Sequence, residues 1–152
     1  MPRFVDFADG IGRFAAAPGH LASDPHAEPL APDAWSPESG APLLLAGDAE
    51  PETRFVSAPM VQVHFPAFHD GRGLSLAVLL RTRFGYTGEL RAVGDIRPDL
   101  LHYLERCGFD SFIPAPGVTL HPEDPSLAPH RGHYQASVVQ PAPIFRRPER
   151  SA

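Results

Sequence analysis

Residues 60–93, MVQVHFPAFHDGRGLSLAVLLRTRFGYTGELRAV, decide the fold of this chain. The apolar, β-branched run 60–65 is typical of a buried strand, and it stops at Pro66, which cannot donate to a ladder. Residues 73–84 have the length and apolar content of a buried helix, with cations in the last turn. Residues 90–93 are again apolar except for Arg91, so the stretch predicts a strand, a helix and a second strand in succession.

The same alternation extends on both sides of this unit. Residues 42–46 predict a strand upstream, residues 98–107 predict a helix with one apolar face, and residues 109–113 predict a further strand. Strands that alternate with helices of about ten residues favour parallel pairing through right-handed βαβ crossovers. We therefore expect an α/β protein with a small parallel sheet of about four strands. The domain should span 42–140 and be best defined over 60–114.

The two flanks of this domain are rich in proline. Of the 19 prolines in the chain, only two lie within 60–113. Because proline breaks helix interiors and cannot donate to a ladder, we expect an irregular, poorly ordered N-terminal arm over 1–41 and a C-terminal tail over 141–152. Trp35 is the exception in the arm, and its large apolar ring is expected to pack the arm onto the domain rather than to stack on a ligand.

The composition excludes several broad classes of partner. A formal net charge of -5, with 13 basic and 18 acidic residues, gives no basic footprint for nucleic acid or a membrane surface. The N-terminus, MPRFVDFADGIGRF, lacks the apolar core of a signal peptide, and no apolar run approaches the roughly 20 residues of a membrane span. We therefore expect a cytoplasmic protein that binds neither nucleic acid nor a membrane. The oligomeric state stays open.

The turn that follows the second strand, FPAFHDGRG, is the first candidate site. In parallel α/β sheets, ligands bind beyond the carboxyl ends of the strands, and this turn leads into a helix N-terminus whose free N–H groups favour an anion. We therefore predict an anion-binding site formed by Asp70, Gly71, Arg72, Gly73 and Ser75. The alternative is a capped turn, in which Asp70 accepts helix N–H groups and Arg72 is solvated.

Two further charged residues join Asp70 as candidates for catalysis. Asp95 follows the third strand and is expected beside Asp70, where paired carboxylates can act as acid and base. Alternatively, Asp95 caps the helix that follows it. Arg91 lies within a strand that should be covered on both faces, so its charge needs a carboxylate partner. The candidates for that partner are Asp70, Asp95 and Glu89.

The remaining candidates concern partners and cofactors. Phe65 and Phe68 are expected to be exposed and to dock another protein, because aromatic side chains commonly anchor interfaces.

A dinucleotide-binding turn needs GxGxxG, and the sequence GRGLSL does not supply it. His130 and His133 lack a third ligand at a defined spacing, so no metal site is predicted. Cys107, the single cysteine, is expected to be buried and inert. No intrinsic cofactor is predicted, and any redox centre would be borrowed from a partner.

Three motifs together resemble a known bacterial family. FPAFHDGRGLSLAVLLRTRFGYTGELRAVGD, LERCGFDSF and YQASVVQPAPIFRR occur in the order and spacing of the family catalogued as domain of unknown function 934. That family is commonly described as a probable oxidoreductase or accessory protein of assimilatory sulfite reduction. Its genes tend to lie beside those for the sulfite reductase haemoprotein and the adenylylsulfate-reducing enzymes. The resemblance therefore implies a function in sulfur assimilation, with the haemoprotein as the suspected partner.

Three functions follow from these observations. The first is an accessory partner of sulfite reductase, which the resemblance implies. The second is a small enzyme or sensor that binds a sulfur oxyanion or a phosphorylated ligand at the start of the helix. The third is a non-catalytic scaffold that docks another protein. Whether the chain is itself an enzyme stays open at this point.

Overall fold

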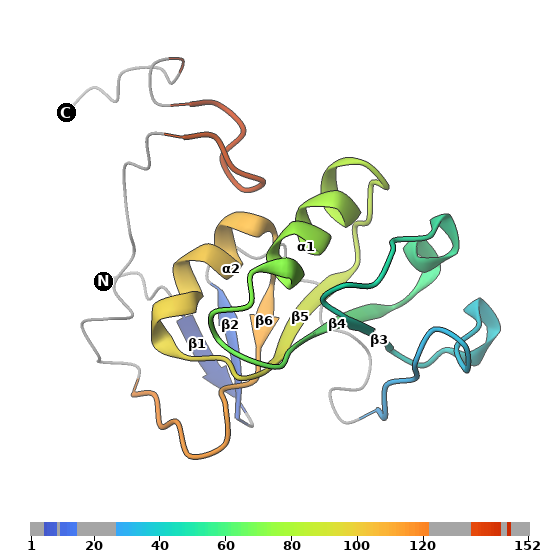
Figure 1. The fold of residues 1–152 in the computed structure, drawn as a ribbon, viewed down its shortest axis with the longest axis horizontal. Coiled ribbons are helices and arrows are strands. Elements are labelled where there is room, and N and C mark those ends of the chain that lie inside the picture. The colour runs from blue at the N-terminus through green and yellow to red at the C-terminus, as the bar shows by residue number, and fades with distance from the viewer. Residues whose placement is uncertain (1–4, 9, 15–26, 122–134, 144–145, 147–152) are drawn as a thin grey trace.

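The centre of the molecule is a mixed sheet of six strands with the order β1-β2-β6-β5-β4-β3 (Figure 1). The computed structural model describes residues 5–8, 10–14, 27–121, 135–143 and 146, and all statements below refer to them. The strands are β1 Val5–Ala8, β2 Ile11–Phe14, β3 Leu43–Ala46, β4 Met60–Phe65, β5 Glu89–Gly94 and β6 Ser111–Phe112. The helices are α1 Arg72–Thr82 and α2 Leu101–Cys107, with short 3-10 turns η1 Pro37–Ser39, η2 Thr53–Ser57 and η3 Pro98–Leu100.

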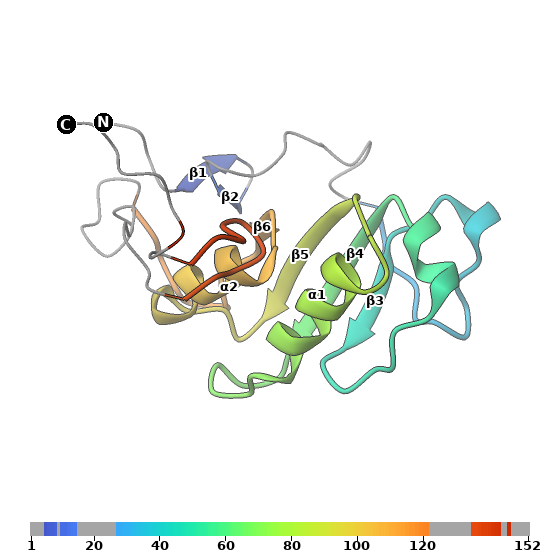
Figure 2. The same ribbon diagram turned by 90° about the horizontal axis from the view of Figure 1, so that it is seen from above.

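The four strands β3 to β6 pair in parallel and follow each other in chain order across the sheet. Helix α1 connects β4 to β5, and helix α2 connects β5 to β6. Because each new strand is added on the same side of the previous one, crossovers of one hand place both helices on the same face. Figure 2 shows α1 and α2 side by side on one face of the sheet. The α/β class predicted from the sequence is therefore confirmed.

The helices pack through the faces that the sequence indicates. Helix α1 buries Gly73, Leu76, Ala77 and Leu80, which recur at the spacing of one helical face. Helix α2 ends at Gly108, whose φ of 102° is readily adopted only by glycine. Below the helices, every second residue of β3, β4 and β5 points into the core, and each buried Leu, Val or Phe there stabilises the fold by about 1.5–3 kcal/mol.

The expectation of an irregular N-terminal arm over 1–41 is wrong for residues 5–8 and 10–14, whereas 27–41 are mostly turns and coil with the short η1. Strands β1 and β2 form a hairpin, and β2 pairs antiparallel with β6. Phe7 and Phe14 pack on the Phe112 ring, and Gly12 leaves room for that ring, because a Cβ at Gly12 would overlap it. The arm thus extends the sheet by two strands, and the expected count of about four is not confirmed.

Trp35 packs the second half of the arm onto the domain, as the sequence predicts. Its side chain is buried, its ring meets Phe55 edge to face, and its Nε1 donates to the carbonyl oxygen of Ala41 at 2.9 Å. Arg54 lies over both rings and donates to Glu52 at 2.6 Å.

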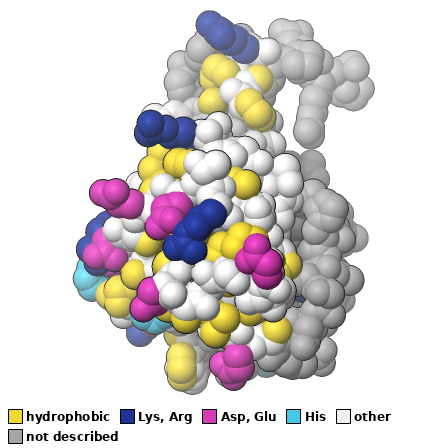
Figure 3. Space-filling model, turned by 90° about the vertical axis from the view of Figure 1, so that its right-hand side faces the viewer, with side chains coloured by type: hydrophobic (Ala, Val, Ile, Leu, Met, Phe, Trp, Pro, Cys, Tyr) yellow, Lys and Arg dark blue, Asp and Glu magenta, His cyan; other side chains and the backbone are white. Residues whose placement is uncertain are grey.

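The face beside β3, turned to the viewer in Figure 3, carries acidic and basic side chains close together, with small hydrophobic areas between them.

Residues 135–143 lie against the C-terminal end of α2 (Figures 1 and 2). The backbone N–H of Val138 donates to the carbonyl oxygen of Arg106 at 3.0 Å, which satisfies one of the carbonyl groups left open at the end of the helix. None of the helices described has the length and apolarity that crossing a bilayer requires.

Candidate functional site

The turn between β4 and α1 is organised around Asp70. Its carboxylate accepts hydrogen bonds from the guanidinium of Arg72, from Nε to Oδ1 at 3.0 Å and to Oδ2 at 3.2 Å, and from Nη2 to Oδ2 at 2.7 Å. The backbone N–H of Arg72 also donates to Oδ1, at 3.2 Å. These bonds to Arg72 lower the pKa of Asp70 to about 2. Asp70 therefore bonds to the first turn of α1 and holds the arginine that follows it.

The predicted anion site at the start of α1 is thereby occupied by the protein's own carboxylates. Arg72 contacts Asp70 and lies 3.7 Å from Asp48, and its pKa is raised chiefly by its bond to Asp70. Gly73 is buried under the Phe65 ring, which a Cβ at this position would approach to 2.7 Å. Gly71 and Ser75 are exposed. As in the capped-turn alternative, Asp70 accepts a backbone N–H of the first helical turn, but Arg72 is paired with Asp70 and not merely solvated.

Asp95 joins the two loops at the carboxyl ends of β4 and β5. Its Oδ2 accepts the backbone N–H of Phe68 at 3.0 Å, and its Oδ1 accepts Nε of Arg97 at 2.9 Å. The bond from Arg97 is the main cause of a lowered pKa for Asp95. The carboxylate thus fixes the neighbouring turn instead of capping the next helix. Asp95 and Asp70 each pair with a different arginine.

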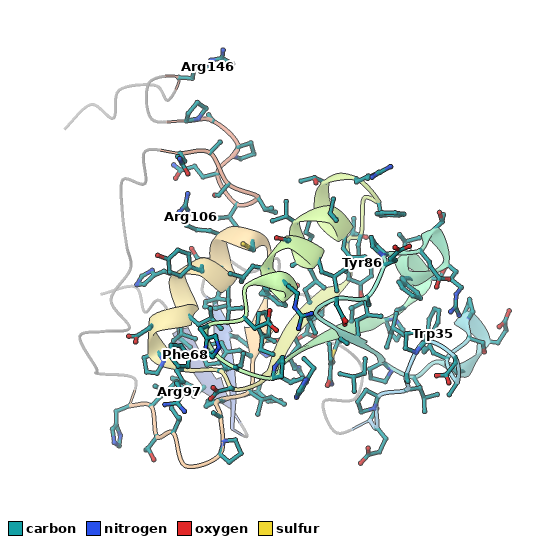
Figure 4. The ribbon with its side chains drawn as sticks, in the orientation of Figure 1. Trp35, Phe68, Tyr86, Arg97, Arg106 and Arg146 are labelled. Atoms are coloured by element: carbon teal, nitrogen blue, oxygen red, sulfur yellow. The ribbon has the colours of Figure 1, made fainter. Side chains whose placement is uncertain are left out.

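Phe68 and Arg97 form an exposed aromatic and cationic pair at this edge (Figure 4). The guanidinium carbon of Arg97 lies 5.3 Å from the centroid of the Phe68 ring, and Phe68 is 45% exposed. Phe65, in contrast, is only 1% exposed and packs on Phe109 inside the core. The expectation that Phe65 docks a partner is therefore wrong, because the last residue of β4 points toward the helices and not to solvent.

Arg91 lies on the sheet face opposite the helices. It is fully buried, and its Nη2 donates to Oε1 of Glu89 at 3.0 Å, so Glu89 is the partner among the three expected candidates. The same oxygen accepts from Ser111 Oγ at 2.8 Å and from Arg13 Nη1 at 3.0 Å. Burial lowers the pKa of Arg91, and its Nη1 has no hydrogen-bond partner.

The candidate residues Arg72, Arg91 and Asp95 do not meet in one open site. Each is paired locally, and Arg91 lies on a different face of the sheet from the turn before α1. The topology explains why, since ligands of open α/β sheets occupy the crevice where the strand order reverses. From β3 to β6 the order does not reverse, so this parallel part of the sheet has no switch point of that kind.

Arg81 is the principal structural residue that sequence reasoning did not identify. Its guanidinium donates to the carbonyl oxygens of Tyr86, Gly88 and Gly108 at 2.8–3.0 Å and to Oδ2 of Asp110 at 2.7 Å. The same oxygen of Asp110 accepts the backbone N–H of Leu90 at 3.0 Å. The available signal was an arginine in the last turn of an otherwise apolar helix, but its partners are up to 29 residues away.

The described part of the chain gives little support for a metal site or for a reactive cysteine. No cluster of three or more His, Cys, Asp or Glu side chains occurs within it, and His130 and His133 lie outside it. Cys107 is half-buried, and burial raises the pKa of its thiol. This environment favours the thiol over the reactive thiolate, in line with an inert cysteine.

The comparison with known proteins concerns the segment that carries this turn. A family described as bacterial protein of unknown function (DUF934) matches residues 44–145. The match includes β4, both helices, β5 and β6, and it begins after the hairpin of β1 and β2. No curated protein and no solved structure matches the chain.

Proposed function

The chain belongs to the bacterial DUF934 family, and from this membership we propose that it is a cytoplasmic accessory protein of assimilatory sulfite reduction. In this proposal it docks on the sulfite reductase haemoprotein. We name the haemoprotein as the partner because the three sequence motifs resemble those of a family described as accessory to sulfite reduction. The haemoprotein supplies the redox centre, so the oxidoreductase description applies to the complex and not to an intrinsic cofactor of this chain.

The observation that carries the docking proposal is the exposed pair of Phe68 and Arg97. Aromatic and arginine side chains are enriched among the residues that dominate binding energy at protein interfaces. Here the pair is held before any partner arrives, because Asp95 bonds both the backbone of Phe68 and the guanidinium of Arg97. Such preorganisation reduces the entropy cost of ordering side chains on binding. We call Phe68, Asp95 and Arg97 the docking triad.

An anion-binding enzyme or sensor at the start of α1 is the alternative function. A ligand there would have to displace Asp70 from Arg72, because the carboxylate already occupies both Nε and Nη2. Asp70→Asn should therefore increase the affinity for sulfite, sulfate or a nucleotide sulfate if such a site exists. Calorimetry that detects no binding of these anions to either protein would remove this alternative.

The docking proposal is tested by binding of the purified chain to the haemoprotein. Phe68→Ala is expected to weaken the complex by about 30-fold, the loss that truncation of a residue worth about 2 kcal/mol produces. Tyr103→Ala is the matched control, because Tyr103 is a 57% exposed aromatic residue outside the triad. The absence of a wild-type complex, or equal losses for the two variants, would contradict the proposal. Normal growth of a deletion strain on sulfate would also contradict it.

A further inference from the structure

A groove of about 610 Å³ lies between α1, the C-terminal half of α2 and residues 136–141. Its volume falls within the range of small-molecule sites, which are typically mostly apolar with a few polar groups. Val78 of α1 and Val138 and Pro141 of the C-terminal segment supply apolar surface, and Tyr103 and Cys107 line it from α2. The docking triad lies near the other end of α2 (Figure 4).

The wall formed by the C-terminal segment is held in place by several contacts. Val138 donates its N–H to the Arg106 carbonyl oxygen at 3.0 Å, and its side chain lies so close to Gly108 that a Cβ there would approach it to 3.0 Å. Ser137 and Gln140 bond to each other twice, since Ser137 N–H donates to the Gln140 carbonyl and Gln140 N–H donates to Ser137 Oγ. The groove is thus a built feature of the described fold.

The two arginines that line the groove differ in how far their hydrogen-bonding capacity is used. Arg81 is neutralised by Asp110 and donates to three carbonyl oxygens. Within the described residues, Arg106 makes one long hydrogen bond, from Nη2 to the Gln135 carbonyl oxygen at 3.4 Å, and its Nε is buried without a partner there. No carboxylate among the described residues forms an ion pair with Arg106. A buried donor that lacks a partner is costly, and an anion would satisfy it.

We propose that this groove binds a small amphipathic organic anion. The apolar body of the ligand lies along Val78, Val138 and Pro141, and its carboxylate, sulfonate or phosphate group pairs with the guanidinium of Arg106. The positive charge of Arg106 requires a negative charge on the ligand, and the apolar lining of the groove requires that the rest of the ligand be largely apolar. This binding site is separate from the docking triad and does not depend on the proposed partner.

Arg106 has a simpler role against which the proposal must be tested. It lies in the last turn of α2, where a cation interacts favourably with the partial negative charge of the helix C-terminus. If this were its only role, replacing Arg106 would lower stability without changing ligand affinity. A pair of probes that share one apolar body and differ in charge separates the two roles.

The test uses 8-anilinonaphthalene-1-sulfonate and its neutral analogue N-phenyl-1-naphthylamine with the folded, full-length chain. The sulfonate is expected to bind at one site per chain, and Arg106→Gln should weaken it about tenfold or more, while Arg106→Lys retains part of the affinity. The neutral amine should bind both proteins alike. Arg83→Gln, at an exposed arginine that does not line the groove, is the control and should leave both probes unaffected. Equal affinity of the sulfonate for wild type and Arg106→Gln would overturn the proposal.

Cys107 provides a second readout that does not depend on any variant folding. It is the single cysteine of the chain and lines the groove, so N-ethylmaleimide reports on that position alone. With the sulfonate at ten times its Kd, alkylation should slow by about tenfold, because only the unoccupied fraction reacts. An unchanged alkylation rate under saturating sulfonate would overturn the proposal, since the probe would then bind elsewhere.

Discussion

Replacing Arg81 with Met should destabilise the protein more than any other single arginine replacement on α1. The substitution keeps an apolar stem of similar length and removes only the guanidinium. It leaves Asp110 buried without its cation, and it also removes the donor from three carbonyl oxygens in the two turns at the amino ends of β5 and β6. The two turns would then lose the side chain that joins them.

The expected loss in the free energy of unfolding follows from the burial of the Arg81–Asp110 ion pair. The side chains of Arg81 and Asp110 are 11% and 9% exposed, and breaking a pair this buried by removing one partner costs about 3–5 kcal/mol. Tyr86 and Gly108 are buried, so the loss of a donor to their carbonyl oxygens adds to that cost. A domain of this size has a free energy of unfolding of about 5–15 kcal/mol, and the loss is therefore a large part of the total.

Urea denaturation followed by circular dichroism measures this loss. Arg83→Met, two residues further along the chain at an exposed arginine, is the matched control and should stay within about 0.5 kcal/mol of wild type. Asp110→Asn should cost less than Arg81→Met, because burial already raises the pKa of Asp110 and an amide removes that unfavourable charge. The double variant should then be less destabilised than the sum of the two, by at least about 1 kcal/mol. A loss below about 1 kcal/mol for Arg81→Met would refute the reasoning.

Three further predictions concern residues of the candidate site. Gly73→Ala should cost about 1–3 kcal/mol in urea denaturation because its Cβ would meet the buried side chains beneath it, whereas Gly71→Ala, with nothing within 4 Å, should be neutral or slightly stabilising. Glu89→Gln should cost about 3–5 kcal/mol because it removes the carboxylate at the centre of a buried cluster. Arg91→Met should cost clearly less, because it removes a buried cation with one unbonded nitrogen, and equal losses would contradict this. The pKa of Asp70 is lowered in the folded state. The stabilisation of the fold by its carboxylate is therefore fully present above pH 3.8 and is lost as the pH falls to about 2. The melting temperatures of wild type and Asp70→Asn should therefore converge over that pH interval, and a constant difference would contradict the assigned pKa.

The parallel half of the sheet could be predicted because its signals are local. Strand β4 was predicted with its observed ends, since a β-branched run stops at a proline. Helix α1 was predicted from its apolar content and differs from expectation only at its ends, where helices fray. Alternating elements of this kind leave few topologies, and parallel pairing with covering helices is the common one.

The hairpin of β1 and β2 was not predicted because it depends on a distant partner. Its strands have four residues each, and Gly12 lies within the second, so such short stretches carry a weak periodic signal. The strand pairing becomes favourable only when Phe112, about a hundred residues later in the chain, supplies the ring on which the hairpin packs. Contacts so far apart in sequence leave no trace in local propensity.

The charged residues of the candidate site carry a local signal that was present in the sequence and was not used. Four arginines follow an acidic residue by two positions and pair with it in the structure: Glu52 with Arg54, Asp70 with Arg72, Glu89 with Arg91, and Asp95 with Arg97. In the extended strand β5, residues two apart point to the same side, so the spacing of Glu89 and Arg91 already predicts that they pair. Arg106 follows Leu104 instead, and it is the arginine that the groove leaves with a buried, unbonded Nε. The spacing of charges therefore directs the search for a ligand away from the turn before α1 and toward the C-terminal end of α2.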